Sequence, residues 1–85
     1  MVKVFESGFW KVTVDKEENL FQVEYRDLLL RYPFQMALDE VREMSVGEIV
    51  SFIQSTAFDF PPEDEEDAWT SLEDLLQRMK EEGEI

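Results

Sequence analysis

The chain has 85 residues, a formal net charge of −13, and neither cysteine nor histidine. The absence of cysteine excludes disulfide bonds and cysteine-based zinc sites. The absence of histidine removes the usual general base at neutral pH and the commonest metal ligand. Apolar residues nevertheless make up 44% of the chain, too many for a disordered protein. We therefore expect one small folded domain over residues 1–85, not an enzyme, with no catalytic residues, metal site or cofactor.

Residues 1–26 predict a three-stranded antiparallel meander, because apolar side chains recur with the period of two that strands show. A three-residue loop with Gly8 in the left-handed conformation would place Val4 opposite Trp10 and Val2 opposite Val12. We favour this register because it gathers the large apolar groups on one inner face.

The third strand is expected to continue that inner face, with Phe21 opposite Val12 and Val23 opposite Trp10. The outer face would then contain both apolar and polar side chains: Lys3, Phe5, Phe9, Lys11, Thr13, Leu20, Gln22 and Glu24. Its apolar members are either scattered surface residues or a contact patch for a partner or a second copy of the chain.

Residues 27–58 predict two short helices. Residues 26–32 fit either a bulged extension of the third strand or a helical turn. Beyond Pro33, helical spacing predicts a first helix to about Met44, with an apolar stripe of Phe34, Ala37, Leu38 and Val41. The pattern Ser45-Val46-Gly47-Glu48 is typical of a capping box, so a second helix is expected to begin at Ser45.

Residues 59–85 predict an acidic third helix, which begins near Pro62 to Asp64 after the break at Phe60-Pro61-Pro62. Its apolar stripe consists of Ala68, Leu72, Leu75, Leu76 and Met79. Gly83 would stop this helix, and the residues after it would fray. The expected fold class is therefore α+β, a three-stranded antiparallel meander followed by three helices packed on one face of the sheet.

Negative charge is concentrated in the same segment. From Asp59 onward there are 11 acidic and two basic residues, a net charge of −9, whereas the first 58 residues carry −4. A helix N-terminus accounts for the run at residues 63–67, because acids there complement the helix dipole. The spacing does not match a calcium loop, so we expect no specific metal site. The acids that continue along the helix require another explanation, because excess charge costs stability.

We interpret the chain as a small acidic binding protein that contacts its partner through this surface. The predicted partner is a basic protein such as a nuclease or another nucleic-acid-binding enzyme, which the chain would inhibit as a nucleic-acid mimic. Small acidic phage proteins that block restriction or CRISPR nucleases are similar in size and charge, although no motif is shared. The candidate acidic contacts are Glu63, Asp64, Glu65, Glu66, Asp67, Glu73 and Asp74. The candidate aromatic anchors are Phe60 and Trp69, followed by Phe5 and Phe9.

The alternative is an antitoxin, an immunity-type protein or a subunit of a larger complex. Such a protein would use the outer sheet face or the flank of the second helix, and charge would only steer association. A monomer in solution would favour the inhibitor, and a dimer through Phe5, Phe9 and Leu20 would favour the alternative. In a third interpretation, the acidic surface has no binding role and is a general solubility or halophilic feature. Under each of these three interpretations, we expect a cytoplasmic protein that binds neither nucleic acid directly nor a membrane.

Overall fold

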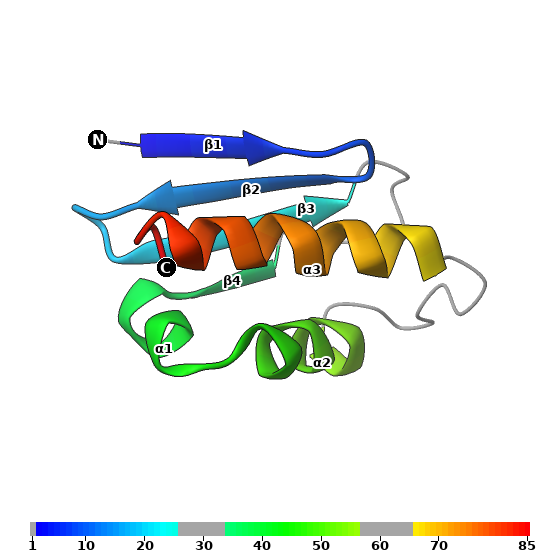
Figure 1. Cartoon of the computed structure of the whole chain (residues 1–85). Coiled ribbons are helices and arrows are strands. Elements are labelled where there is room, and N and C mark those ends of the chain that lie inside the picture. Colours follow the sequence, from blue (N-terminus) through cyan, green and yellow to red (C-terminus); the bar gives the residue numbers. More distant parts are fainter. Residues whose placement is uncertain (1, 26–33, 57–65) are drawn as a thin grey trace.

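The computed structural model describes residues 2–25, 34–56 and 66–85 (Figure 1). Four strands form one antiparallel sheet in the order β1-β2-β3-β4, with bounds β1 Val2–Glu6, β2 Trp10–Asp15, β3 Leu20–Tyr25 and β4 Phe34–Ala37. The helices are α1 Leu38–Glu43, α2 Val46–Thr56 and α3 Glu66–Glu81. The α+β class is confirmed, but the sheet has four strands where the sequence predicted three. Two segments carrying predictions, residues 26–33 and 57–65, lie outside the described residues.

The register between β1 and β2 differs from the prediction. Val4 pairs with Thr13 rather than with Trp10, a shift of three residues, and Phe5 pairs with Val12. Because cross-strand partners point to the same side, Phe5 lies on the inner face beside buried Val12. Val4 lies on the outer face and is 50% exposed. The prediction that Val2 and Val4 face the core is therefore wrong, as is the outer-face position of Phe5.

The turn between β1 and β2 explains this register. The Ser7 N–H donates to the Trp10 carbonyl oxygen at 2.8 Å, and the Trp10 N–H donates to Ser7 Oγ at 3.2 Å. The loop therefore closes around Gly8 and Phe9, and Phe9 packs half-buried against the core. Gly8 does not have the predicted left-handed conformation, since Gly83 is the positive-φ glycine of the described residues. Burying parts of two phenylalanines removes more apolar surface from water than burying two valines, which favours the observed pairing.

The register between β2 and β3 is also shifted, here by two residues. Trp10 pairs with Tyr25 and Val12 pairs with Val23, instead of with Val23 and Phe21. Because side chains alternate with a period of two, an even shift keeps every residue on its predicted face. The inner face of these two strands is therefore as predicted, and all of its large apolar residues are buried.

Asn19 ends the turn between β2 and β3 and also connects it to α1. Its φ of 54° lies in the left-handed region, which asparagine tolerates better than most residues. Its backbone oxygen accepts the Leu38 N–H at 2.9 Å, and its Oδ1 accepts the Asp39 N–H at 3.0 Å. Ala37, the residue that precedes α1, offers no side-chain cap. Asn19 thus caps a helix that begins 19 residues later in the sequence.

This contact gives a test by substitution. Replacing Asn19 by glycine keeps the left-handed backbone but removes the cap, so we expect a loss of about 1 kcal/mol in the free energy of unfolding. Replacement by alanine should cost more, since it also forces a Cβ into positive φ. Urea denaturation of the two variants measures both quantities. Equal stability of all three proteins would show that Asn19 does not cap α1.

Residues 34–37 form β4, not the start of the predicted first helix. Phe34 pairs with Val23 and Met36 with Phe21, so both point to the inner face. The spacing Phe34, Ala37, Leu38 fits a helix, but Phe34 and Met36 also fit the period of a strand. Short apolar segments carry this ambiguity, and sheet pairing resolves it here. The helical part, α1, is correspondingly shorter than predicted.

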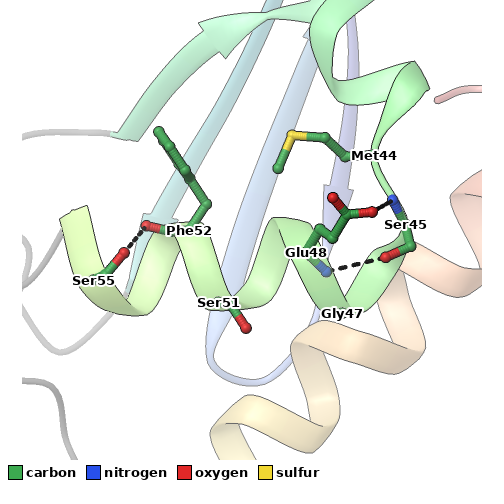
Figure 2. Close-up of a pocket in the computed structure, with 7 residues that line it drawn as sticks. All are labelled: Met44, Ser45, Gly47, Glu48, Ser51, Phe52 and Ser55. Atoms are coloured by element: carbon green, nitrogen blue, oxygen red, sulfur yellow. Dashed lines mark hydrogen bonds between the residues drawn. The ribbon is translucent and has the colours of Figure 1, made fainter.

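The capping box that begins α2 is confirmed. The Glu48 N–H donates to Ser45 Oγ, and the Ser45 N–H donates to Glu48 Oε1, both at 3.2 Å (Figure 2). The helix buries Ile49, Val50 and Ile53. Phe52 stays 43% exposed, and its ring meets Phe34 of β4 edge to face at 5.7 Å. The second helix therefore packs largely as its sequence pattern predicts.

The helix α3 crosses the inner side of the sheet and packs beside α2 (Figure 1). All five residues of its predicted apolar stripe are buried: Ala68, Leu72, Leu75, Leu76 and Met79. Gly83, with a φ of 78°, ends it as predicted. The Gly83 N–H donates to the Lys80 oxygen and the Glu84 N–H to the Met79 oxygen, the paired bonds of a Schellman motif.

The prediction that the residues after Gly83 fray is wrong. Both Glu84 and Ile85 are only 8% exposed. Glu84 Oε1 accepts a hydrogen bond from Lys3 Nζ on β1 at 2.7 Å, and Lys16 Nζ lies 3.7 Å from Oε2. These contacts anchor the residues that follow α3 to β1 and to the turn between β2 and β3, so the packed region extends past the helix.

Glu84 should make stability depend on pH. The hydrogen bond from Lys3 lowers the pKa of Glu84, partial burial opposes this, and the charge of Lys16 lowers the pKa further. A carboxylate with a lowered pKa stabilises the fold above its unfolded pKa of about 4.3, and this stabilisation disappears as pH falls through the folded value. We expect Glu84→Gln to have a lower urea midpoint than wild type at pH 7. The two midpoints should converge as pH falls below about 4. A constant difference across that range would contradict the assignment.

Candidate functional site

The exposed side of α3 carries a row of carboxylates. Because its apolar stripe packs on the sheet, the opposite side of the helix faces solvent. Five acidic residues there are exposed, and we call them the acidic face: Glu66, Asp67, Glu73, Asp74 and Glu81. Four were predicted contact residues, and the structure places all four on this one surface. The other predicted acids, Glu63, Asp64 and Glu65, lie outside the described residues, as does Phe60.

Among the described residues, the carboxylates of the acidic face have no ion-pair partner. Within the described part of the chain, the ion pairs are Lys3–Glu84 and Lys16–Glu84, so no carboxylate of the acidic face is neutralised by a partner. Arg78 and Lys80 lie on the same helix but nearer its carboxyl end, where positive charge complements the helix dipole. The carboxylates nearest the start of α3 are thus the most available to the basic side chains of a partner.

Trp69 borders this face. It is half-buried, and its ring lies 5.1 Å from the ring of Trp10. Trp10 is fully buried, its ring lies 4.6 Å from that of Tyr25 at a tilt of 57°, and its indole N–H donates to the Ala68 carbonyl oxygen at 2.7 Å. Trp69 is therefore held against the core through its contact with Trp10. Tryptophan is also a residue type that is enriched at protein interfaces.

The other two predicted anchors have different positions. Phe5 faces the inner side and Phe9 lies in the loop before β2, and both pack against the core. The proposed outer-face patch of Phe5, Phe9 and Leu20 does not form, because only Leu20 lies on that side, opposite Asp15. The apolar residues most exposed on the outer face are Val2 and Val4.

The structure also gathers acids that the sequence analysis did not single out. The Asn19 contacts bring the start of α1 to the turn between β2 and β3, and the Lys16–Glu84 contact brings the end of α3 there. Exposed acids from the three segments thus share one end of the molecule, which we call the acidic end: Glu17, Glu18, Asp39, Glu40 and Glu82 (Figure 1). No local pattern could reveal this group, because its members are up to 65 positions apart in the sequence.

A shallow groove runs along the exposed side of α2 (Figure 2). It is lined by Met44, Ser45, Gly47, Glu48, Ser51, Phe52 and Ser55. Ser45 and Glu48 are occupied by the capping box, and the Ser55 hydroxyl donates to the Phe52 carbonyl oxygen. The groove therefore offers an exposed phenylalanine and few uncommitted polar groups.

Two chemical properties of the described residues bear on function. No three of their carboxylates lie close enough together to hold a metal ion. None of the described helices has the combined length and apolar character needed to cross a bilayer.

In comparisons of this chain with protein-family models, curated proteins and solved structures, no significant match was found.

Proposed function

We propose that this protein binds a basic protein surface that normally holds nucleic acid, and that the acidic face of α3 is the contact. The observation that carries the proposal is the set of five exposed, uncompensated carboxylates on one rigidly packed helix. A basic groove would meet them without any rearrangement of this chain. Complementary charge of this kind accelerates association and opposes binding of acidic competitors.

The spacing of the carboxylates favours mimicry of a single strand over a duplex. Glu66 and Glu81 are 15 residues apart, about 22 Å along the helix. Five carboxylates divide that length into four intervals, so their mean spacing is ~5.6 Å. A nucleic-acid strand carries one charge per ~3.4 Å of axis, whereas a duplex carries one per ~1.7 Å. The proposed target is therefore a groove that holds single-stranded nucleic acid, and binding there would block the nucleic acid.

Trp69 would supply the apolar part of this contact. Charges at an interface mainly steer association, and a few buried aromatic groups provide most of the affinity. Base-stacking aromatic residues line many single-strand grooves, and a tryptophan can pack on them. Because Trp69 is held by Trp10, little conformational entropy is lost when a partner covers it.

The test uses two variants with the same net charge. The first neutralises the acidic face with Glu66→Gln, Asp67→Asn, Glu73→Gln and Asp74→Asn. The matched control neutralises the acidic end with Glu18→Gln, Asp39→Asn, Glu40→Gln and Glu82→Gln. Each immobilised protein is exposed to nuclease-treated cell lysate, and bound proteins are eluted with increasing salt or with a single-stranded oligonucleotide.

We expect wild type and the acidic-end variant to retain proteins that elute with salt and are displaced by the oligonucleotide. The acidic-face variant should bind them at least about tenfold more weakly, which corresponds to ~1.4 kcal/mol. Equal retention by both variants would contradict a specific role of α3. Retention that is insensitive to salt and oligonucleotide would contradict the proposal as a whole.

A further inference from the structure

The edge strand β1 buries less of its surface than the two strands that follow it. Val2 and Val4 are 54% and 50% exposed, and Phe5 is the half-buried member of the strand. In β2 and β3, by contrast, every second residue is buried. An element with few buried apolar groups opens at a lower free energy than the core of the same domain. We therefore expect β1 to separate from the sheet more readily than β2 or β3.

The side chain of Glu84 connects β1 to two other segments. Its Oε1 accepts the hydrogen bond from Lys3 Nζ on β1 at 2.7 Å, and its Oε2 lies 3.7 Å from Lys16 Nζ in the turn after β2. Glu84 and Ile85 are buried, whereas both lysine side chains are about half exposed. One buried carboxylate thus joins β1, the turn between β2 and β3, and the residues that follow α3.

The burial of this carboxylate makes the two ends of the contact depend on each other. If β1 separates, Lys3 leaves with it, and Glu84 keeps the cost of burial without its hydrogen-bonded partner. If residues 84–85 separate, β1 loses its ion pair with Glu84. Separation of one segment therefore lowers the cost of separating the other, which is the behaviour of a single cooperative unit.

We propose that Glu84 is a latch, through which β1 and residues 84–85 open and close together while β2, β3 and α3 remain folded. The contacts of the core support this division. Trp10 of β2 is fully buried, and its indole N–H donates to the Ala68 carbonyl oxygen of α3. This bond joins the sheet to the helix without any contribution from β1.

The latch determines which strand forms this edge of the sheet. The bond from the Ser7 N–H to the Trp10 oxygen marks a hydrogen-bonded pair, and such pairs alternate along an antiparallel ladder. The N–H and C=O groups of Val12 and Val14 therefore point toward β1 and are uncovered when it opens. A newly exposed strand edge readily pairs with other chains, so the closed latch protects against aggregation. It uses no carboxylate of the acidic face, and it can be correct whether or not that face binds a partner.

Hydrogen exchange followed by nuclear magnetic resonance measures the opening of each segment. The Lys3 and Phe5 amides report on β1, because their ladder positions direct them toward β2. The Glu84 amide, which donates to the Met79 oxygen at 2.8 Å, reports on the residues after α3. The Leu76 amide within α3 is the reference for unfolding of the core. In wild type, the three reporter amides should have similar protection factors, at least about tenfold below that of Leu76.

Reciprocal substitutions test the coupling between the two segments. Glu84→Gln should lower the protection of the Lys3 and Phe5 amides about three- to tenfold. Lys3→Gln should lower the protection of the Glu84 amide by a similar factor, because a coupling free energy is the same in both directions. The double variant should differ little from either single variant. Glu82→Gln removes the same charge from an exposed neighbouring position, and it should leave the protection of β1 unchanged.

Three results would overturn the latch. Protection of the Lys3, Phe5 or Glu84 amide equal to that of Leu76 would place that segment in the same unit as the core. Faster exchange at Glu84 but not at β1 in the Glu84→Gln variant would show that the two segments open separately. An equal loss of protection at every amide, with Leu76 included, would show that the contact stabilises the whole fold rather than one unit of it.

Discussion

Replacing Trp10 by alanine is expected to lower the free energy of unfolding by about 3–5 kcal/mol. Trp10 is fully buried between Tyr25 and Trp69, and its indole N–H satisfies the Ala68 carbonyl oxygen of α3. The substitution removes the largest fully buried side chain and leaves a cavity between sheet and helix. Small domains have a total stability of about 5–15 kcal/mol, so this loss would remove a large share of it.

Trp10→Phe separates packing from hydrogen bonding. Phenylalanine keeps much of the apolar volume but cannot donate to Ala68, so we expect a loss intermediate between wild type and Trp10→Ala. Urea denaturation followed by circular dichroism gives the three midpoints and their slopes. A loss below about 1 kcal/mol for Trp10→Ala would show that the sheet and α3 do not depend on this side chain.

The sequence predicts most accurately those elements whose signals are local. The capping box of Ser45 and Glu48 begins α2, and Gly83 ends α3, because both signals depend on residues within a turn of helix. The buried stripe of α3 is equally clear, because 16 helical residues repeat their periodicity several times. In β4 only four residues alternate, too few to distinguish the period of a strand from that of a helix.

The predictions fail where contacts between residues far apart in the sequence determine the structure. The β1 register depends on Lys3 reaching Glu84, which is 81 positions away, and on Phe9 entering the core from a loop. Asn19 caps a helix in another part of the chain, and this requires the turn and α1 to be folded already. In the candidate site, the carboxylates of α3 share a face as their helical spacing predicts. The acidic end could not be predicted, because only tertiary contacts bring its three segments together.

The second large loss in the free energy of unfolding is expected for a substitution at Leu76, which joins the acidic face to the core. Leu76 lies on the buried side of α3 and is fully buried, so Leu76→Ala should cost about 2–5 kcal/mol through lost burial and a residual cavity. The neighbouring residue Gln77 is exposed, and Gln77→Ala should change stability by no more than about 0.5 kcal/mol. Thermal denaturation of the two variants makes this comparison on adjacent positions of one helix.

The consequence for binding distinguishes a rigid acidic surface from charge alone. Leu76→Ala keeps all 21 acidic residues and the net charge of −13. If affinity depends on carboxylates held at fixed spacing beside Trp69, the variant should bind proteins from lysate more weakly than Gln77→Ala under conditions where both are folded. If net charge alone attracts basic proteins, the two variants should bind equally. Equal binding would contradict mimicry of a nucleic-acid strand, since a mimic must hold its charges in place before the partner arrives.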